Sequence, residues 1–275
     1  MAAFRFLRFF RFQLHLPMTR ALPRTNFHSS RLIRFLADLS MVDAVEPGNA
    51  FAEKLGLWVD FTDAITLSAV HNTNAAGPTD ASAGMPSLAG VAIADELNRI
   101  RTRLENSITK SGSASAGGTR IAFPAPVLEL PMDLTAAYTP YRRYHAAHQR
   151  DMDLSIPPLR VNVRQALTSA SPALKKLAAL DAALDGILSD REEKLLAKLP
   201  LLFKSRFVQL FKAHQQRLSD TGQADNPAVW MHAGGWLARF CSDLQAVLLA
   251  ELDLRLQPAL GLIEAFNQEI EDRHE

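Results

Sequence analysis

The sequence predicts an all-α protein, in which a small N-terminal helical segment and flexible linkers precede a C-terminal helical bundle. The clearest observation is the stretch 171–218, where apolar residues recur at three- and four-residue steps, the period of a helix with one buried face. A second observation is that no alternating apolar–polar run is long enough to build a sheet. Apolar residues make up 48% of the chain, a share typical of globular proteins, which argues against disorder of the whole chain.

Local signals divide the stretch 171–218 into separate helices. Ser171 followed by Pro172 has the pattern of an N-cap and a first-turn proline, whose missing N–H would have no intrahelical partner there. Asp190, with Glu193 three residues later, has the pattern of a capping box and predicts another helix start. Pro200 removes a backbone donor and crowds the preceding turn, so we expect a corner between two packed helices.

The helix after Pro200 is predicted to be amphipathic. Its apolar face comprises Phe203, Phe207, Leu210, Phe211, His214 and Leu218, and its basic residues, on the other side, are Lys204, Arg206, Lys212 and Arg217. Phe203, Phe207 and Phe211 therefore have two interpretations. They pack in the core of the bundle, or they form a face kept for a partner helix.

Composition divides the rest of the chain into segments. We expect an N-terminal helical segment at 29–71, a linker at 72–88, a short amphipathic helix at 89–110, a Gly/Ser/Pro linker at 111–130 and the bundle domain at 131–275. The first segment should hold two helices, the second with Phe51, Leu55, Trp58, Thr62, Ile65 and Ala69 on one face. The proline-spaced end of the second linker is expected to lie extended along a helical surface.

The C-terminal part is predicted to contain a long helix that begins at Asn226-Pro227. Gly234 and Gly235 would lie inside this helix, where each glycine costs about 1 kcal/mol relative to alanine. Close packing of a neighbouring helix against these glycines would offset that cost. Pro258 is expected to end or kink the helix.

Residues 1–28 are predicted to be a disordered segment or a leader outside the folded domain. No acidic residue precedes Asp38, whereas seven arginines do. Residues 4–17 interleave Phe with Arg, which makes them too short and too charged to span a bilayer but suited to an anionic membrane surface. A start codon assigned upstream of a true start at Met18 is the alternative. Removing residues 1–17, with three arginines, changes the formal net charge from +1 to −2, so the basic charge is not a functional indication.

Charge and cysteine content limit the classes of protein. A formal net charge of +1 produces no global field that would attract nucleic acid or anionic lipid. The single cysteine, Cys241, excludes an intramolecular disulfide and is typical of a reducing cytoplasm. We therefore expect a cytoplasmic protein without a transmembrane segment.

The segment 138–164 combines tyrosine with arginine. Tyr141, Arg142, Arg143 and Tyr144 are its centre, and Tyr138, Arg150, Arg160 and Arg164 extend it. Aromatic stacking together with phosphate contacts is how proteins hold single-stranded nucleic acid. A nucleic-acid-binding module is therefore one hypothesis, and an exposed basic helix face with half-buried tyrosines is the other.

Residues able to support catalysis or metal binding are present, but no catalytic or cofactor motif organises them. His145 and His148 share a helix face and could share a metal, yet no further ligand pattern accompanies them, so packing against another helix is the simpler interpretation. Cys241 lies in an apolar stretch, where a thiol is inert. We expect no catalytic, cofactor or metal site, and hence a protein that is not an enzyme.

Several stretches, taken in order, resemble one known family. They are SSRLIRFLADLS, FAEKLGLWVDFTDAITLSAV, YRRYHAAHQRDMDLSIPPLRVNVRQAL, LAALDAALDGIL and REEKLLAKLPLLFKSRF. The family is an uncharacterised proteobacterial one, classed only as a domain of unknown function, with members encoded near MotA/TolQ/ExbB-type proton-channel proteins and OmpA-like proteins. This resemblance implies a protein partner in a proton-channel-type envelope complex and a location peripheral to the inner membrane. It supplies no catalytic residue.

Overall fold

The computed structural model describes residues 31–39, 59–72, 86–110, 121–126 and 131–272. The predicted leader, the first part of the apolar face at 51–58 and most of both linkers lie outside these residues. Every regular element in the described ranges is helical, which confirms the predicted all-α class. The elements are α1 (Arg31–Asp38), α3 (Phe61–Asn72), α4 (Pro86–Thr109), α5 (Leu134–Ala170), α6 (Pro172–Leu196), α7 (Leu199–Thr221), the 3₁₀ helix η2 (Pro227–Val229) and α8 (Trp236–Asp272).

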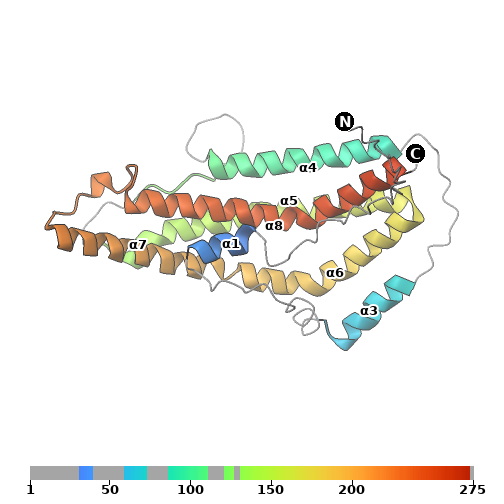
Figure 1. Cartoon of the computed structure of the whole chain (residues 1–275), viewed down its shortest axis with the longest axis horizontal. Helices are drawn as coiled ribbons and strands as arrows, with labels where there is room; N and C mark the ends of the chain where they lie inside the picture. Colours follow the sequence, from blue (N-terminus) through green and yellow to red (C-terminus); the bar gives the residue numbers. More distant parts are fainter. Residues whose placement is uncertain (1–30, 40–58, 73–85, 111–120, 127–130, 273–275) are drawn as a thin grey trace, which may run out of the picture.

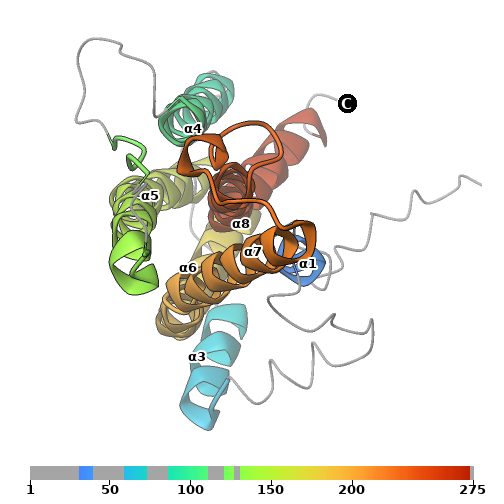
Figure 2. The ribbon, with the colours of Figure 1, turned by 90° about the vertical axis from the view of Figure 1, so that its left-hand side faces the viewer.

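Helix α8 is the centre of the bundle. Seen end-on it lies among α1, α4, α5, α6 and α7, and in the side view α4 and α5 run along it (Figures 1 and 2). Its apolar residues are buried along almost its whole length, among them Leu237, Phe240, Leu244, Val247, Leu248, Leu252, Leu256 and Phe266. A helix that is apolar on most of its circumference is stable only inside a protein, which explains why the other helices surround α8.

The short amphipathic helix predicted at 89–110 is present as α4. Ile93, Leu97 and Leu104 are buried, Ile100 is half-buried, and α4 packs against α8 and α5. Helix α1 also packs on α8, through Leu32 and Leu36, and Arg31 Nη1 lies 2.8 Å from Asp253 Oδ2. These N-terminal helices therefore pack against the C-terminal ones.

Helices α5 and α6 meet at a single residue. Ser171 is extended, and its buried hydroxyl accepts a hydrogen bond from the backbone N–H of Leu174 at 3.1 Å. Pro172 follows at the first turn, as predicted. The cap satisfies one of the N–H groups that a helix start leaves without a partner, so the chain reverses here without a longer loop.

The predicted helix start at Asp190 is wrong. α6 continues through Asp190 to Leu196, and the chain turns only before Pro200, at the corner where α7 begins. No proline interrupts α6 after Pro172, so nothing breaks its backbone hydrogen bonds at Asp190. A capping pattern on an exposed helix face is compatible with the helix interior, since Asp costs only a few tenths of a kcal/mol there.

The glycine pair 234–235 does not lie inside a helix, contrary to the prediction. Asn226 does cap a helical turn, but that turn is the short η2, and α8 begins only at Trp236. Gly234 has a φ of 84°, a left-handed conformation that favours glycine. A Cβ on Gly235 would lie 2.1 Å from the carbonyl oxygen of Trp230, so the chain passes too close to itself for any other residue.

Pro258 was expected to end or kink its helix, and the first of these alternatives is excluded. α8 continues through Pro258 to Asp272, and packing on several sides compensates for the one missing hydrogen bond. The predicted face of α3 needs correction. α3 does not bury the predicted face of Thr62, Ile65 and Ala69, all of which are exposed. It rests on α6 instead, and its half-buried positions fall on a different helix face at Asp63, Leu67 and Val70.

Among the described residues, no helix has both the length and the apolar character needed to cross a membrane.

Candidate functional site

The tyrosines and histidines of the segment 138–164 point into the bundle. Tyr138, Tyr141, Tyr144, His145 and His148 are all at most 4% exposed. Their spacing on α5 places them on one face, as the packing interpretation predicts. The Tyr and Phe rings make edge-on or tilted contacts, such as Tyr141 with Phe240 at 5.3 Å between ring centroids. The rings that nucleic-acid stacking would require are therefore covered by the protein itself.

The three phenylalanines proposed as a partner face are also in the core. Phe203, Phe207 and Phe211 are at most 4% exposed. Phe207 contacts the rings of Trp236 and Phe240 on α8, at 5.2 Å and 5.0 Å between centroids. These three phenylalanines pack in the core, so their rings are not open to a partner helix.

The segment before α5 packs against the same tyrosines. Residues 121–126 have no regular secondary structure, and the ring of Phe123 lies 4.9 Å from that of Tyr144 and 6.2 Å from that of Tyr141, centroid to centroid. This is the arrangement expected for the proline-spaced end of the linker.

A polar cluster lies buried between α5 and α8. Gln149 Nε2 donates to Glu251 Oε1 at 3.0 Å, and Arg255 Nη2 pairs with the same oxygen at 2.9 Å. Burial raises the pKa of Glu251, but His145, Arg255 and Gln149 outweigh that effect, so the net pKa is lowered. Among the described residues, no group of three His, Cys, Asp or Glu side chains is arranged to hold a metal ion. Gln149 and Arg255 thus hold the buried carboxylate of Glu251 in place.

Cys241 on α8 is buried beside Tyr141. Burial raises the pKa of its thiol to about 12, although a hydrogen bond with Tyr141 acts in the opposite direction. A thiol with so high a pKa is almost entirely protonated at neutral pH, and the protonated form is a poor nucleophile.

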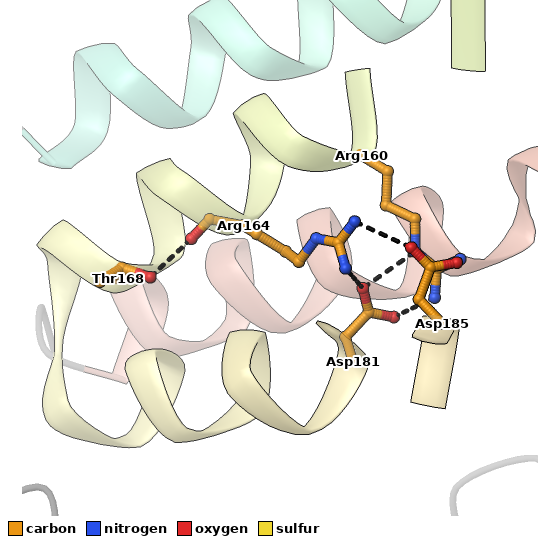
Figure 3. A network of polar contacts seen from close by, with 5 residues as sticks. All are labelled: Arg160, Arg164, Thr168, Asp181 and Asp185. Carbon is orange, nitrogen blue, oxygen red and sulfur yellow. Dashed lines mark hydrogen bonds and ion pairs between the residues drawn. The ribbon is translucent and has the colours of Figure 1, made fainter. Parts of the chain in front are cut away.

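Two arginines of the Tyr/Arg segment are neutralised by the neighbouring helix (Figure 3). Arg160 on α5 binds Asp181 of α6 with two nitrogens, at 2.9 and 2.6 Å, and reaches Asp185 at 2.6 Å. Arg164 contacts the same two carboxylates, at 3.0 Å to Asp185 and 3.6 Å to Asp181. The cluster is balanced, with two positive and two negative charges, and its function is to join α5 to α6.

Arg142 and Arg143 line a groove at the surface, whereas Arg150 is exposed outside its lining. This corner groove, of about 610 Å³, lies between α5 and the corner where α6 ends and α7 begins. Its lining consists of Thr135, Tyr138, Thr139, Arg142, Arg143 and Ala146 from α5, and Ala197, Pro200, Leu201 and Lys204 from the corner. None of these lining residues is acidic.

Local sequence explains how the corner groove is built. Pro200 fixes the start of α7, and its carbonyl oxygen accepts a hydrogen bond from the Tyr138 hydroxyl at 2.5 Å, which holds the corner against α5. Burial raises the pKa of Tyr138, so this hydroxyl remains protonated and able to donate. Leu201, the next residue, is then turned outward and is 68% exposed.

The cations of the corner groove are not neutralised as Arg160 and Arg164 are. Arg142 and Arg143 are exposed and Lys204 is half-buried, and none of the three forms an ion pair within the described part of the chain. The sequence pointed to Arg142 and Arg143 but not to Lys204 or Leu201. The only signal for these two was Pro200, because a corner there brings the first turn of α7 beside α5.

Comparisons with known proteins give one family. Residues 18–268 match the family described as "Protein of unknown function (DUF3348)". No curated protein and no solved structure matches the chain.

Proposed function

The chain belongs to the DUF3348 family, and we propose that it is a non-enzymatic interaction subunit that binds a protein partner in the corner groove. The observation that carries this proposal is the combination of three unneutralised cations with the exposed Leu201 in one surface groove. Apolar contacts surrounded by charged groups are the usual composition of a protein-binding surface.

The arrangement of the other candidate residues supports the same proposal. The core contains the tyrosines, histidines and phenylalanines that the sequence indicated as candidates. Cys241 is also buried, and the pKa of its thiol is raised. Arg160 and Arg164 are occupied by Asp181 and Asp185. Arg142 and Arg143, which face solvent, both line the corner groove.

The identity of the partner rests on the family resemblance alone. That resemblance implies a proton-channel-type envelope complex, and we propose that the protein acts at the cytoplasmic side of such a complex, peripheral to the inner membrane. The alternative is a nucleic-acid-binding module that uses Arg142 and Arg143.

Affinity capture from the native organism tests the proposal. The tagged full chain is compared with the variant Arg142→Ala/Arg143→Ala/Lys204→Ala, with half of each lysate treated with nuclease. We expect a defined protein partner that the wild type retains after nuclease treatment and the variant loses. Proteins that disappear with nuclease would favour the nucleic-acid alternative. Equal capture by the variant and the wild type would show that the corner groove is not the binding surface.

A further inference from the structure

The chemistry of the corner groove indicates what kind of segment it binds. Arg142 and Arg143 on α5 and Lys204 on α7 supply positive charge from both walls, and no acidic residue lines the groove. Arginine presents a fork of N–H donors that matches a carboxylate with two parallel hydrogen bonds. Carboxylates are therefore the groups that these walls recognise best.

The apolar residues that line the corner groove indicate a second property of the bound segment. Leu201 is 68% exposed, and Ala146, Ala197 and Pro200 lie beside it in the lining. Burying an exposed leucine against a partner removes apolar surface from water, which favours binding. A ligand that carried charge alone would leave this surface in contact with water.

These features favour a peptide over a nucleic acid. Single-stranded nucleic acid is held by stacking on exposed aromatic rings along a basic path. Here Tyr138, Tyr141 and Tyr144 are buried, and the basic path is interrupted where Asp181 and Asp185 neutralise Arg160 and Arg164. A volume of about 610 Å³ accommodates a few side chains of a peptide.

We propose that the corner groove binds an acidic amphipathic segment of the partner protein. Carboxylates of that segment pair with Arg142, Arg143 and Lys204, and an apolar side chain packs on Leu201. The hydrogen bond from Tyr138 to Pro200 keeps the two walls at a fixed separation, so the groove is formed before the partner arrives. This inference rests on the proposed function, and it adds the chemical class of the partner segment.

Site-specific cross-linking tests the inference in the native organism. The full chain carries the photo-cross-linking residue p-benzoylphenylalanine in place of Leu201, and the cross-linked segment is identified by peptide mass spectrometry. A second chain carries the same residue in place of Leu154, which is 69% exposed on α5 but does not line the groove. We expect a segment rich in Asp and Glu with an apolar anchor to cross-link at position 201 but not at position 154.

A matched pair of charge variants shows whether Arg142, Arg143 and Lys204 are responsible for binding the partner segment. Arg142→Ala/Arg143→Ala/Lys204→Ala should lower the cross-linking yield at position 201 roughly tenfold or more. Lys175→Ala/Lys212→Ala/Arg217→Ala removes the same charge at exposed positions outside the groove and should leave the yield unchanged.

The outcomes separate this inference from the proposed function. A groove-dependent partner whose cross-linked segment is not acidic would overturn the inference and leave the proposed function intact. Cross-links to nucleic acid, or to a second copy of this chain, would overturn the inference in favour of those occupants. Cross-links that survive in the groove variant, or no cross-link at position 201, would overturn both.

Discussion

His145 and Glu251 face each other in the middle of the bundle, with Nε2 of His145 3.5 Å from Oε2 of Glu251 and both side chains at most 1% exposed. This distance is longer than a well-formed hydrogen bond. The two residues come from α5 and α8, so the contact ties together helices that are distant in sequence. A buried carboxylate of this kind makes stability sensitive to the loss of its charge and of its partners.

Replacing Glu251 with alanine should destabilise the fold strongly. The substitution leaves Gln149 and the inner nitrogens of Arg255 without their carboxylate, and breaking a buried pair costs about 3–5 kcal/mol. Urea unfolding followed by circular dichroism measures the free energy of unfolding. The control is Glu264→Ala on the exposed side of α8, which should change it by less than about 0.5 kcal/mol. Equal effects of the two substitutions would contradict the role assigned to Glu251.

Stability should fall in mild acid because of His148. Burial, and next the neighbouring His145, lower the pKa of His148 from 6.5 to about 4. Between these two pH values the unfolded chain binds a proton at His148 and the folded chain does not, so the free energy of unfolding decreases as pH falls from about 6.5 to 4. One pKa unit corresponds to about 1.4 kcal/mol, so the contribution of this group amounts to roughly 3 kcal/mol over the whole range.

Unfolding curves at a series of pH values provide the measurement. His148→Gln should remove most of this pH dependence, whereas His71→Gln, at an exposed position on α3, should leave it as in the wild type. A wild-type stability that is constant from pH 6.5 to 4.5 would refute the assignment.

Two glycine-to-alanine substitutions should change the stability of the fold in opposite directions. A Cβ at Gly235 would lie 2.1 Å from the carbonyl oxygen of Trp230, so Gly235→Ala forces the backbone apart and should cost more than about 2 kcal/mol. Gly186 lies inside α6 with no atom within 4 Å of the added Cβ, so Gly186→Ala should stabilise by about 0.5–1 kcal/mol. Thermal melting of both variants measures the difference, and a shift in the same direction for both would be inconsistent with the structure.

The pair Arg160 and Asp181 should show strong energetic coupling. Both side chains are largely buried, at 15% and 12% exposed, and the guanidinium binds the carboxylate with two nitrogens. A double-mutant cycle with alanine at both positions should give a coupling energy of about 1–3 kcal/mol. The more exposed pair Arg101 and Glu105 on α4 is the comparison, with an expected coupling of about 0.3–0.5 kcal/mol. Similar coupling energies in both cycles would show that burial does not strengthen the interaction between Arg160 and Asp181.

Cys241 should be unreactive in the folded protein. Its thiol is buried and its pKa is raised to about 12, so little thiolate is present near neutral pH. Titration with Ellman's reagent at pH 8 should detect almost no free thiol in the native state and one thiol per chain in 6 M guanidinium chloride. Rapid reaction of the native protein would show that this part of α8 opens to solvent.

The sequence predicted the helices whose signals are local. Ser171 and Pro172 predict a helix start because a cap and a first-turn proline act within one turn, and the structure places α6 there. The apolar spacing of Phe203 and Phe207 predicts a buried face, and both rings are in the core. Where local signals were ambiguous the predictions were wrong. Asp190 has a capping pattern although it lies inside a helix. Gly234 and Gly235 are compatible with either a weak helix or a turn, and the structure has a turn there.

The sequence predicted only part of the candidate site. It identified Arg142 and Arg143, because both are basic residues in the Tyr/Arg segment. It did not separate these two from Arg160 and Arg164, because neutralisation depends on Asp181 and Asp185, which lie about 20 residues away on another helix. Nor did it join Lys204 and Leu201 to them.

The sequence by itself thus determined that the chain is helical and where α6 and α7 begin, since caps, prolines and apolar spacing act over a few residues. Only the tertiary structure decided which cations remain without a carboxylate and which apolar side chains remain exposed. Those properties depend on the contacts between α5 and its neighbours. Electrostatic pairing and burial act through space, between atoms that the linear order of residues does not place together.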